Sequence, residues 1–217
     1  MTATGVCNVT LLHAYLPHSS RAEQIMSMPV SAISRRFTEA EFYEERDAAP
    51  YGERWELVDG EVLVTPAPHW NHQQTTLHLT ILLHDYVRAQ SLGITLPSPL
   101  DVRLEPGLVM QPDIVVVPAG HLRTMNDSVS KLLLAVEVIS RSSARFDRVV
   151  KRPRYQRHRV SEYWIVDNAS QLIERWQPDD ERPAILTEQL TWLPLGASES
   201  FELDVRAFFL EVVPPQS

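Results

Sequence analysis

Two acidic side chains lie inside segments that are otherwise apolar. Glu137 belongs to "LLLAVEVIS" (132–140), and Asp113 directly precedes a run of isoleucine and valine in "LVMQPDIVVVP" (108–118). Successive side chains of a β-strand point to opposite faces, and around Glu137 both sets are apolar. Such a strand is typical of the centre of a covered sheet. Because an unpaired buried carboxylate is costly, each acid needs hydrogen-bond donors or a cation.

A carboxylate pair on neighbouring strands suits a divalent cation that prefers oxygen ligands, such as magnesium, with manganese as an alternative. Such an ion polarises a phosphoryl oxygen and lowers the pKa of a bound water. Lys151 then serves to orient the attacking water or to stabilise the transition state as a point charge. Two alternatives need no metal: a turn or capping role for Asp113, and a salt bridge from Glu137 to an arginine such as Arg103.

The surrounding pattern predicts strands and helices in mixed order. "TEAE" (38–41) has capping-box spacing and predicts a short helix to about residue 46, and Asp59-Gly60 predicts the two-residue turn of a hairpin. A long helix is expected at about 69–90, and further helices are expected at about 143–158 and 204–210. The long helix is the best candidate to cover the sheet, with apolar or aromatic residues near one face that include Leu77, Ile81, His84 and Tyr86, beside Leu79, Leu82 and Leu83. Strands are expected at about 93–96, 99–104, 109–117, 132–140, 162–167, 172–177 and 183–190. Pro153 should kink or interrupt the helix that contains it.

This order predicts an α/β or α+β fold with one mixed β-sheet flanked by helices. The length of 217 residues favours a single domain. Residues 1–36 show no convincing periodicity, so we expect a loosely ordered N-terminal extension followed by one domain over residues 37–217.

Composition narrows the class of protein. Cys7 is the single cysteine, which excludes an intrachain disulfide framework and a cysteine-rich zinc site. No apolar run is long enough for a membrane-spanning helix, and the N-terminus lacks the pattern of a signal peptide. We therefore expect a soluble, cytoplasmic protein without a membrane partner.

The charge is unevenly distributed along the chain. The net charge of −8 argues against a protein that coats nucleic acid nonspecifically. Residues 141–159, however, contain eight of the 20 lysines and arginines and one acid, Asp147. This segment predicts a local phosphate-binding patch, for which the candidates are Arg141, Arg145, Arg148 and Arg152.

Several motifs occur together in a fixed order. They are "WELVDGEVLVTPAPHWNHQ" (55–73), "QPDIVVV" (111–117), "VEVIS" (136–140), Asp147, Lys151 and Tyr155 at four-residue spacing, and "EYWIVD" (162–167). Over residues 37–178 this combination resembles the Uma-type family of restriction-endonuclease-like proteins, a branch of the PD-(D/E)XK nuclease superfamily.

The resemblance implies a restriction-endonuclease-like fold, a Mg²⁺-dependent phosphodiesterase site acting on DNA, and a twofold homodimer. By position, Asp113 is the aspartate of the motif, Glu137 its second acid and Lys151 its lysine. Glu56 is the additional acid, so that the metal ligands are Asp113, Glu137 and Glu56. Supporting roles fall to His72, Gln111 and Tyr155.

The sequence also departs from the superfamily pattern. The lysine usually stands two residues after the second acid, where this chain has Ile139, and Pro153 falls inside the lysine-bearing helix. An alternative interpretation is therefore a catalytically weakened nuclease fold that serves as a DNA- or protein-binding module.

Overall fold

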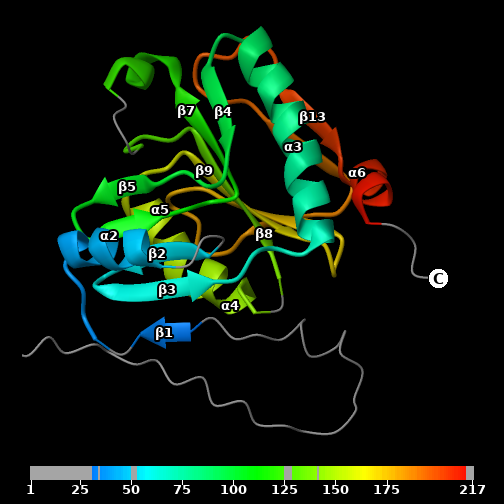
Figure 1. Ribbon diagram of the computed structural model, residues 1–217. Coiled ribbons are helices and arrows are strands. Elements are labelled where there is room, and N and C mark those ends of the chain that lie inside the picture. Colours follow the sequence, from blue (N-terminus) through cyan, green and yellow to red (C-terminus); the bar gives the residue numbers. More distant parts are fainter. Residues whose placement is uncertain (1–30, 34, 50–52, 125–128, 141, 214–217) are drawn as a thin grey trace, which may run out of the picture.

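The Glu137 segment forms a central strand, as its pattern predicts. The computed structural model describes residues 31–33, 35–49, 53–124, 129–140 and 142–213. Within them, strand β8 (Leu134–Ile139) is buried at every position and lies inside a six-stranded sheet (Figure 1). It runs parallel to β9 and antiparallel to β7, so the predicted mixed sheet is confirmed.

The six strands follow the order β11-β10-β9-β8-β7-β4, and all neighbouring pairs except β8 and β9 are antiparallel. The other strands of this sheet are β4 (Gly93–Pro97), β7 (Ile114–Pro118), β9 (Glu162–Asp167), β10 (Leu172–Trp176) and β11 (Ala184–Leu186).

A second, five-stranded antiparallel sheet corrects the prediction of a single sheet. Its order is β1-β3-β2-β6-β5. The predicted strand over 109–117 is divided between the two sheets, because Pro112 has no N–H to continue a ladder. Asp113 lies at this division. The strands are β1 (Ser31–Ile33), β2 (Arg54–Val58), β3 (Glu61–Thr65), β5 (Val102–Glu105) and β6 (Leu108–Met110).

Local signals in the N-terminal half are confirmed. Thr38 caps α2 (Glu39–Ala48) with a complete capping box, and Asp59 and Gly60 take the positive φ angles of the hairpin turn between β2 and β3. Strand β1 lies in the segment assigned to the N-terminal extension and pairs with β3, while residues 1–30 are outside the described residues.

Helix α3 (Trp70–Ala89) covers one face of the six-stranded sheet, together with α6 (Val205–Val212) and the hairpin of β12 (Gln189–Trp192) and β13 (Phe201–Asp204) (Figure 1). Its covering residues include Leu79, Leu83 and Val87, which are buried. Leu79 and Leu83 thus cover the sheet as predicted, whereas Leu77 and Ile81 are about half exposed, which corrects their assignment to the covering face. The prediction failed because α3 has apolar residues on more than one side.

The opposite face of the sheet packs against the five-stranded sheet and the predicted 143–158 helix. That helix is interrupted, as Pro153 predicts, and consists of α4 (Ala144–Phe146), the π-helical turn η2 (Asp147–Lys151) and α5 (Arg152–Arg157). In the wider turn the Arg152 N–H donates to the carbonyl of Asp147, five residues earlier. The side chains of Asp147 and Lys151 are both buried there.

One further element, the 3₁₀-helix η1 (Ala119–Thr124), follows β7. In the part of the chain that the structure describes, no helix combines the length and the apolar character needed to cross a membrane.

Candidate active site

A buried lysine connects the two sheets. Lys151 extends from η2 and its side chain is 0% exposed. Its Nζ lies 2.8 Å from Oε1 of Glu56 on β2 and 2.8 Å from Oε1 of Glu137 on β8. Burial lowers the pKa of Lys151, but the neighbouring carboxylates, Glu137 first, raise it by more than burial lowers it. The net pKa is above its usual value, so the ammonium keeps its charge.

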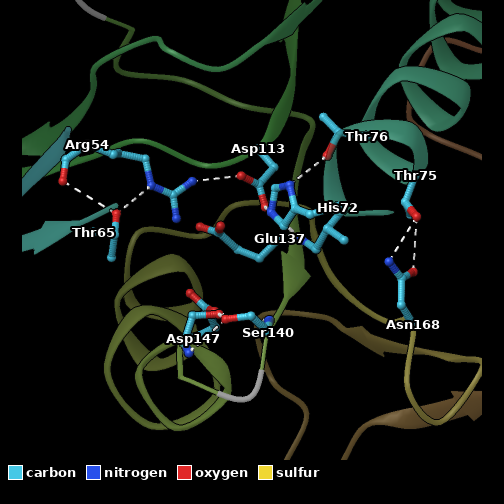
Figure 2. A network of polar contacts seen from close by, with 12 residues as sticks. Arg54, Thr65, His72, Thr75, Thr76, Asp113, Glu137, Ser140, Asp147 and Asn168 are labelled. Carbon is cyan, nitrogen blue, oxygen red and sulfur yellow. Dashed lines mark hydrogen bonds and ion pairs between the residues drawn. The ribbon is translucent and has the colours of Figure 1, made fainter. Parts of the chain in front are cut away.

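Asp113, at the division between the sheets, has three donors. Arg54 Nη1 donates to Oδ1 at 2.7 Å, and the Val138 N–H donates to Oδ2 at 2.7 Å. His72 Nε2, from the first turn of α3, lies 3.0 Å from Oδ2 (Figure 2). Burial raises the pKa of Asp113, but Arg54 and then His72 outweigh it, so this pKa is well below its usual value. Asp113 is therefore an ionised and firmly oriented carboxylate.

Asp147 is less well satisfied. Its Oδ1 lies 3.4 Å from Lys151 Nζ but accepts no hydrogen bond from the described residues, although the side chain is only 2% exposed. Burial raises the pKa of Asp147. The charge of Lys151 lowers this pKa and the charge of Glu56 raises it, and the net result is a pKa above the usual value. The buried hydroxyl of Tyr155 also has no hydrogen-bond partner among the described atoms. The structure thus contains unpaired polar atoms on the helical side of the site.

We call these interacting groups the charge cluster. Its members are Arg54, Glu56, His72, Asp113, Glu137, Asp147 and Lys151. Within the described residues, four carboxylates here face two permanently charged cations, which leaves two negative charges in excess. The excess is visible at Glu137, whose pKa is raised well above its usual value by burial and by the charges of Asp147 and Asp113, despite Lys151.

The sequence matches the Uma2 family, described as "Putative restriction endonuclease", over residues 40–206. The chain belongs to the Uma2 family. Its fold is similar to the crystal structure of a putative nuclease belonging to DUF820 from Anabaena variabilis, with a TM-score of 0.67 and 18% sequence identity. That similarity covers 82% of this chain and 99% of the other chain.

The family match confirms the resemblance seen in the sequence, and the structural similarity confirms the nuclease-like fold class. A search of curated proteins finds no match. All members of the charge cluster lie inside the region that matches the Uma2 family.

The residues of this Uma2 protein fit a divalent cation in kind and in charge. Carboxylate oxygens are the ligands that Mg²⁺ and Mn²⁺ prefer. The formal excess of four carboxylates over two permanent cations equals the charge of one divalent ion, and the buried Asp147 Oδ1 accepts no hydrogen bond from the described residues. No three carboxylates or histidines of the described residues are grouped as a ready-made ligand set. Instead, Arg54 and Lys151 stand between the acids.

The structure brings all four predicted catalytic residues into one network. Glu56, Asp113, Glu137 and Lys151 are all members of the charge cluster, and His72 joins it through Asp113. The alternative salt bridge from Glu137 to Arg103 is not formed, since Arg103 pairs with Glu39 at 2.7 Å.

The two remaining supporting residues act at the margin of the cluster. The backbone N–H of Gln111 donates to Glu56 Oε1 at 2.7 Å, while its side chain turns to Asp101. The ring of Tyr155 packs against that of Tyr163, with centroids 4.7 Å apart. Gln111 therefore orients an acid through its backbone, and Tyr155 lines the buried side.

Two members of the charge cluster, Arg54 and Asp147, were not predicted from the sequence. Both had a signal: Arg54 precedes Glu56 by two residues, which places their side chains on one face of β2. Asp147 precedes Lys151 by one helical turn, so that the two side chains are neighbours.

The basic segment is largely neutralised by acids from distant parts of the chain. Arg148 pairs with Glu174 at 2.6 Å and with Asp167 at 3.2 Å. Arg152 lies over the ring of Trp176 and bonds the carbonyl of Arg148. Other pairs join Arg154 to Asp59, Arg157 to Glu105 and Arg159 to Asp179.

The other two predicted phosphate-binding arginines are Arg145 and Arg141. Arg145 is exposed, and its side chain has no ion pair or hydrogen bond with the described residues. Arg141 lies outside the described residues.

Proposed function

We propose that this Uma2 protein is a metal-dependent endonuclease-like phosphodiesterase that acts on DNA. The observation that carries the proposal is the charge cluster, in which buried carboxylates outnumber permanent cations by two. When bound, a divalent ion polarises a phosphoryl oxygen and lowers the pKa of a water molecule. Asp113, Glu137, Glu56 and Asp147 are the residues that would hold it.

The other members of the cluster have roles that follow from their contacts. His72 fixes the orientation of Asp113 through a 3.0 Å contact. Lys151 is a buried point charge whose ammonium contacts three carboxylates, and it is placed to offset charge that develops during phosphodiester hydrolysis.

Substrate reaches the cluster from the side of Arg54 and His72. Their side chains are 21% and 17% exposed, whereas those of Glu137 and Lys151 are 1% and 0% exposed.

A divalent-ion titration tests the proposed activity. Purified protein is incubated with duplex DNA, single-stranded DNA and RNA of matched sequence, in Mg²⁺, in Mn²⁺ or in EDTA. We expect DNA cleavage that requires the metal and increases with its concentration. Cleavage that continues undiminished in EDTA contradicts the proposal, and preferential cleavage of RNA contradicts its assigned substrate.

A second candidate function is a catalytically weakened nuclease fold used to bind DNA or protein. It is favoured by the cationic partners that Asp113 and Glu137 already have, and by Ile139 at the usual position of the superfamily lysine. DNA binding without cleavage in any metal, unchanged by Asp113→Asn, supports this second candidate over the first.

We expect Arg145 to contact a DNA phosphate, because it is an exposed cation of the basic segment without an acidic partner among the described residues. Arg145→Ala should weaken duplex binding and reduce the slope of log affinity against log salt by about one. Fluorescence anisotropy over a salt series measures both. The matched control is Arg206→Ala, since Arg206 is an exposed arginine paired with Glu188 on the α6 side. Equal slopes for both variants contradict this role.

We also propose that the protein forms a homodimer. Trp70, Leu77 and Ile81 are each about half exposed on α3. Their spacing of seven and four residues places them on one side of the helix, as an apolar contact surface requires.

A further inference from the structure

Arg54 is the one arginine of the charge cluster, and its guanidinium is only partly used. Nη1 donates to Asp113 Oδ1 at 2.7 Å and Nε donates to Thr65 Oγ1 at 3.3 Å. The contact with Asp113 is thus through a single nitrogen. Within the described residues no further hydrogen bond of this side chain is seen, so several of its five N–H donors remain available.

The position of Arg54 separates it from the other cation of the cluster. Lys151 is enclosed at 0% exposure and contacts three carboxylates, whereas Arg54 is 21% exposed and contacts one. A side chain at the solvent edge can leave its partner without exposing the interior of the protein. Arg54 is therefore the cation that can move.

A divalent ion that takes Asp113 as a ligand acts on the same carboxylate as Arg54. Both the metal and the guanidinium bind the ionised carboxylate of Asp113. Where both need the same oxygen, the binding of one excludes the binding of the other. A displaced guanidinium would stay at the partly exposed edge of the cluster, and its planar donors match the oxygens of a phosphate group.

We propose that Arg54 is an internal counter-ion that competes with the divalent cation for Asp113 and, once displaced, binds the phosphate of the substrate. This inference rests on the proposed function, because it assumes a metal at the cluster. It assigns Arg54 two partners in turn. The binding of the divalent cation and the binding of DNA are then coupled, because the cation releases the Arg54 guanidinium that binds the DNA phosphate.

The competition is tested by metal binding in the absence of DNA. Mn²⁺ is titrated into the wild-type protein and Arg54→Gln by isothermal calorimetry at one pH. We expect Arg54→Gln to bind Mn²⁺ at least about tenfold more tightly, because the competing charge is gone. The matched control is Arg46→Gln, which removes an equally close arginine contact, 2.8 Å to Asp101, from a side chain that is 27% exposed and outside the cluster. Its Mn²⁺ affinity should equal that of the wild type.

The second half of the inference is tested with a phosphorothioate DNA duplex that resists cleavage. Mn²⁺ should strengthen duplex binding by the wild-type protein, and this increase should be lost in Arg54→Gln and retained in Arg46→Gln. An increase that persists in Arg54→Gln overturns the phosphate contact.

The outcomes distinguish the inference from the proposed function. If the wild-type protein binds no Mn²⁺, both fail. If it binds Mn²⁺ but Arg54→Gln binds equally or more weakly, the competition is refuted and the metal-dependent function stands. Should Arg54→Gln not fold, Arg54→Met replaces it: the unbranched side chain is kept and the positive charge is removed, so Mn²⁺ binding should still tighten, and an unchanged affinity refutes the competition.

Discussion

Glu137→Gln should remove metal-dependent cleavage while the protein stays folded. The substitution keeps the shape of the side chain but removes the carboxylate that we propose as a metal ligand in β8. A bound metal contributes several kcal/mol to phosphoryl transfer, and each 1.36 kcal/mol corresponds to a factor of ten in rate. We therefore expect cleavage to fall by roughly a thousandfold. Single-turnover cleavage in saturating Mg²⁺ measures the effect.

The control for this loss is Glu162→Gln. Glu162 is also a buried glutamate of the six-stranded sheet, but it accepts hydrogen bonds from Trp164 Nε1 at 2.7 Å and from Gln177 at 3.2 Å, outside the charge cluster. Its replacement should leave the cleavage rate within a few-fold of the wild type. Equal rates for wild-type protein and Glu137→Gln would refute the assignment of the active site.

The stability of Glu137→Gln should depend on pH in a defined direction. Burial first, and then Asp147 and Asp113, raise the pKa of Glu137 in the folded protein. A raised carboxyl pKa contributes stability that is fully present below the unfolded pKa and is lost as the pH rises through the folded pKa. Glutamine does not ionise, so the Glu137→Gln variant does not undergo this loss of stability as the pH rises. In EDTA, the melting temperature of the variant relative to the wild type should therefore increase from pH 5 to pH 8.

Lys151→Met should give the largest loss of stability. Methionine fills much of the lysine volume but leaves Glu56, Glu137 and Asp147 buried without their shared ammonium. Removing one partner of a buried ion pair costs about 3–5 kcal/mol. Urea unfolding at pH 7 without metal should show this loss. It should be smaller at pH 5, where the carboxyls with raised pKa values take up protons.

The chain offers its own control for this variant. Its two lysines are Lys131 and Lys151, and Lys131 is exposed. Lys131→Met should change the free energy of unfolding by less than about 0.5 kcal/mol. A Lys151→Met protein as stable as Lys131→Met would show that the three carboxylates are neutral in the folded protein and need no counter-ion.

Local features of the fold were predictable because short-range rules govern them. The capping box at Thr38, the turn at Asp59-Gly60 and the interruption near Pro153 each depend on a few neighbouring residues. The apolar pattern around Glu137 likewise required a covered central strand. The motif order was sufficient to identify the family.

The arrangement of the two sheets was not predictable in the same way. The segment over 109–117 reads as one apolar strand, yet β6 and β7 belong to different sheets and Asp113 lies between them. Hydrophobic periodicity reports which residues are buried, but it does not report against which partner strand they are buried.

The sequence by itself determined that Asp113 and Glu137 are buried acids that require compensation, because the residues on both sides of Glu137 and those that follow Asp113 are apolar. Tertiary structure alone decided what compensates them: Arg54 for one, 59 residues away in the chain, and Lys151 for the other. It also directed most arginines of the basic segment to distant acids. An ion pair depends on distance in space, and only the packing of β2, β8 and η2 against one another sets those distances.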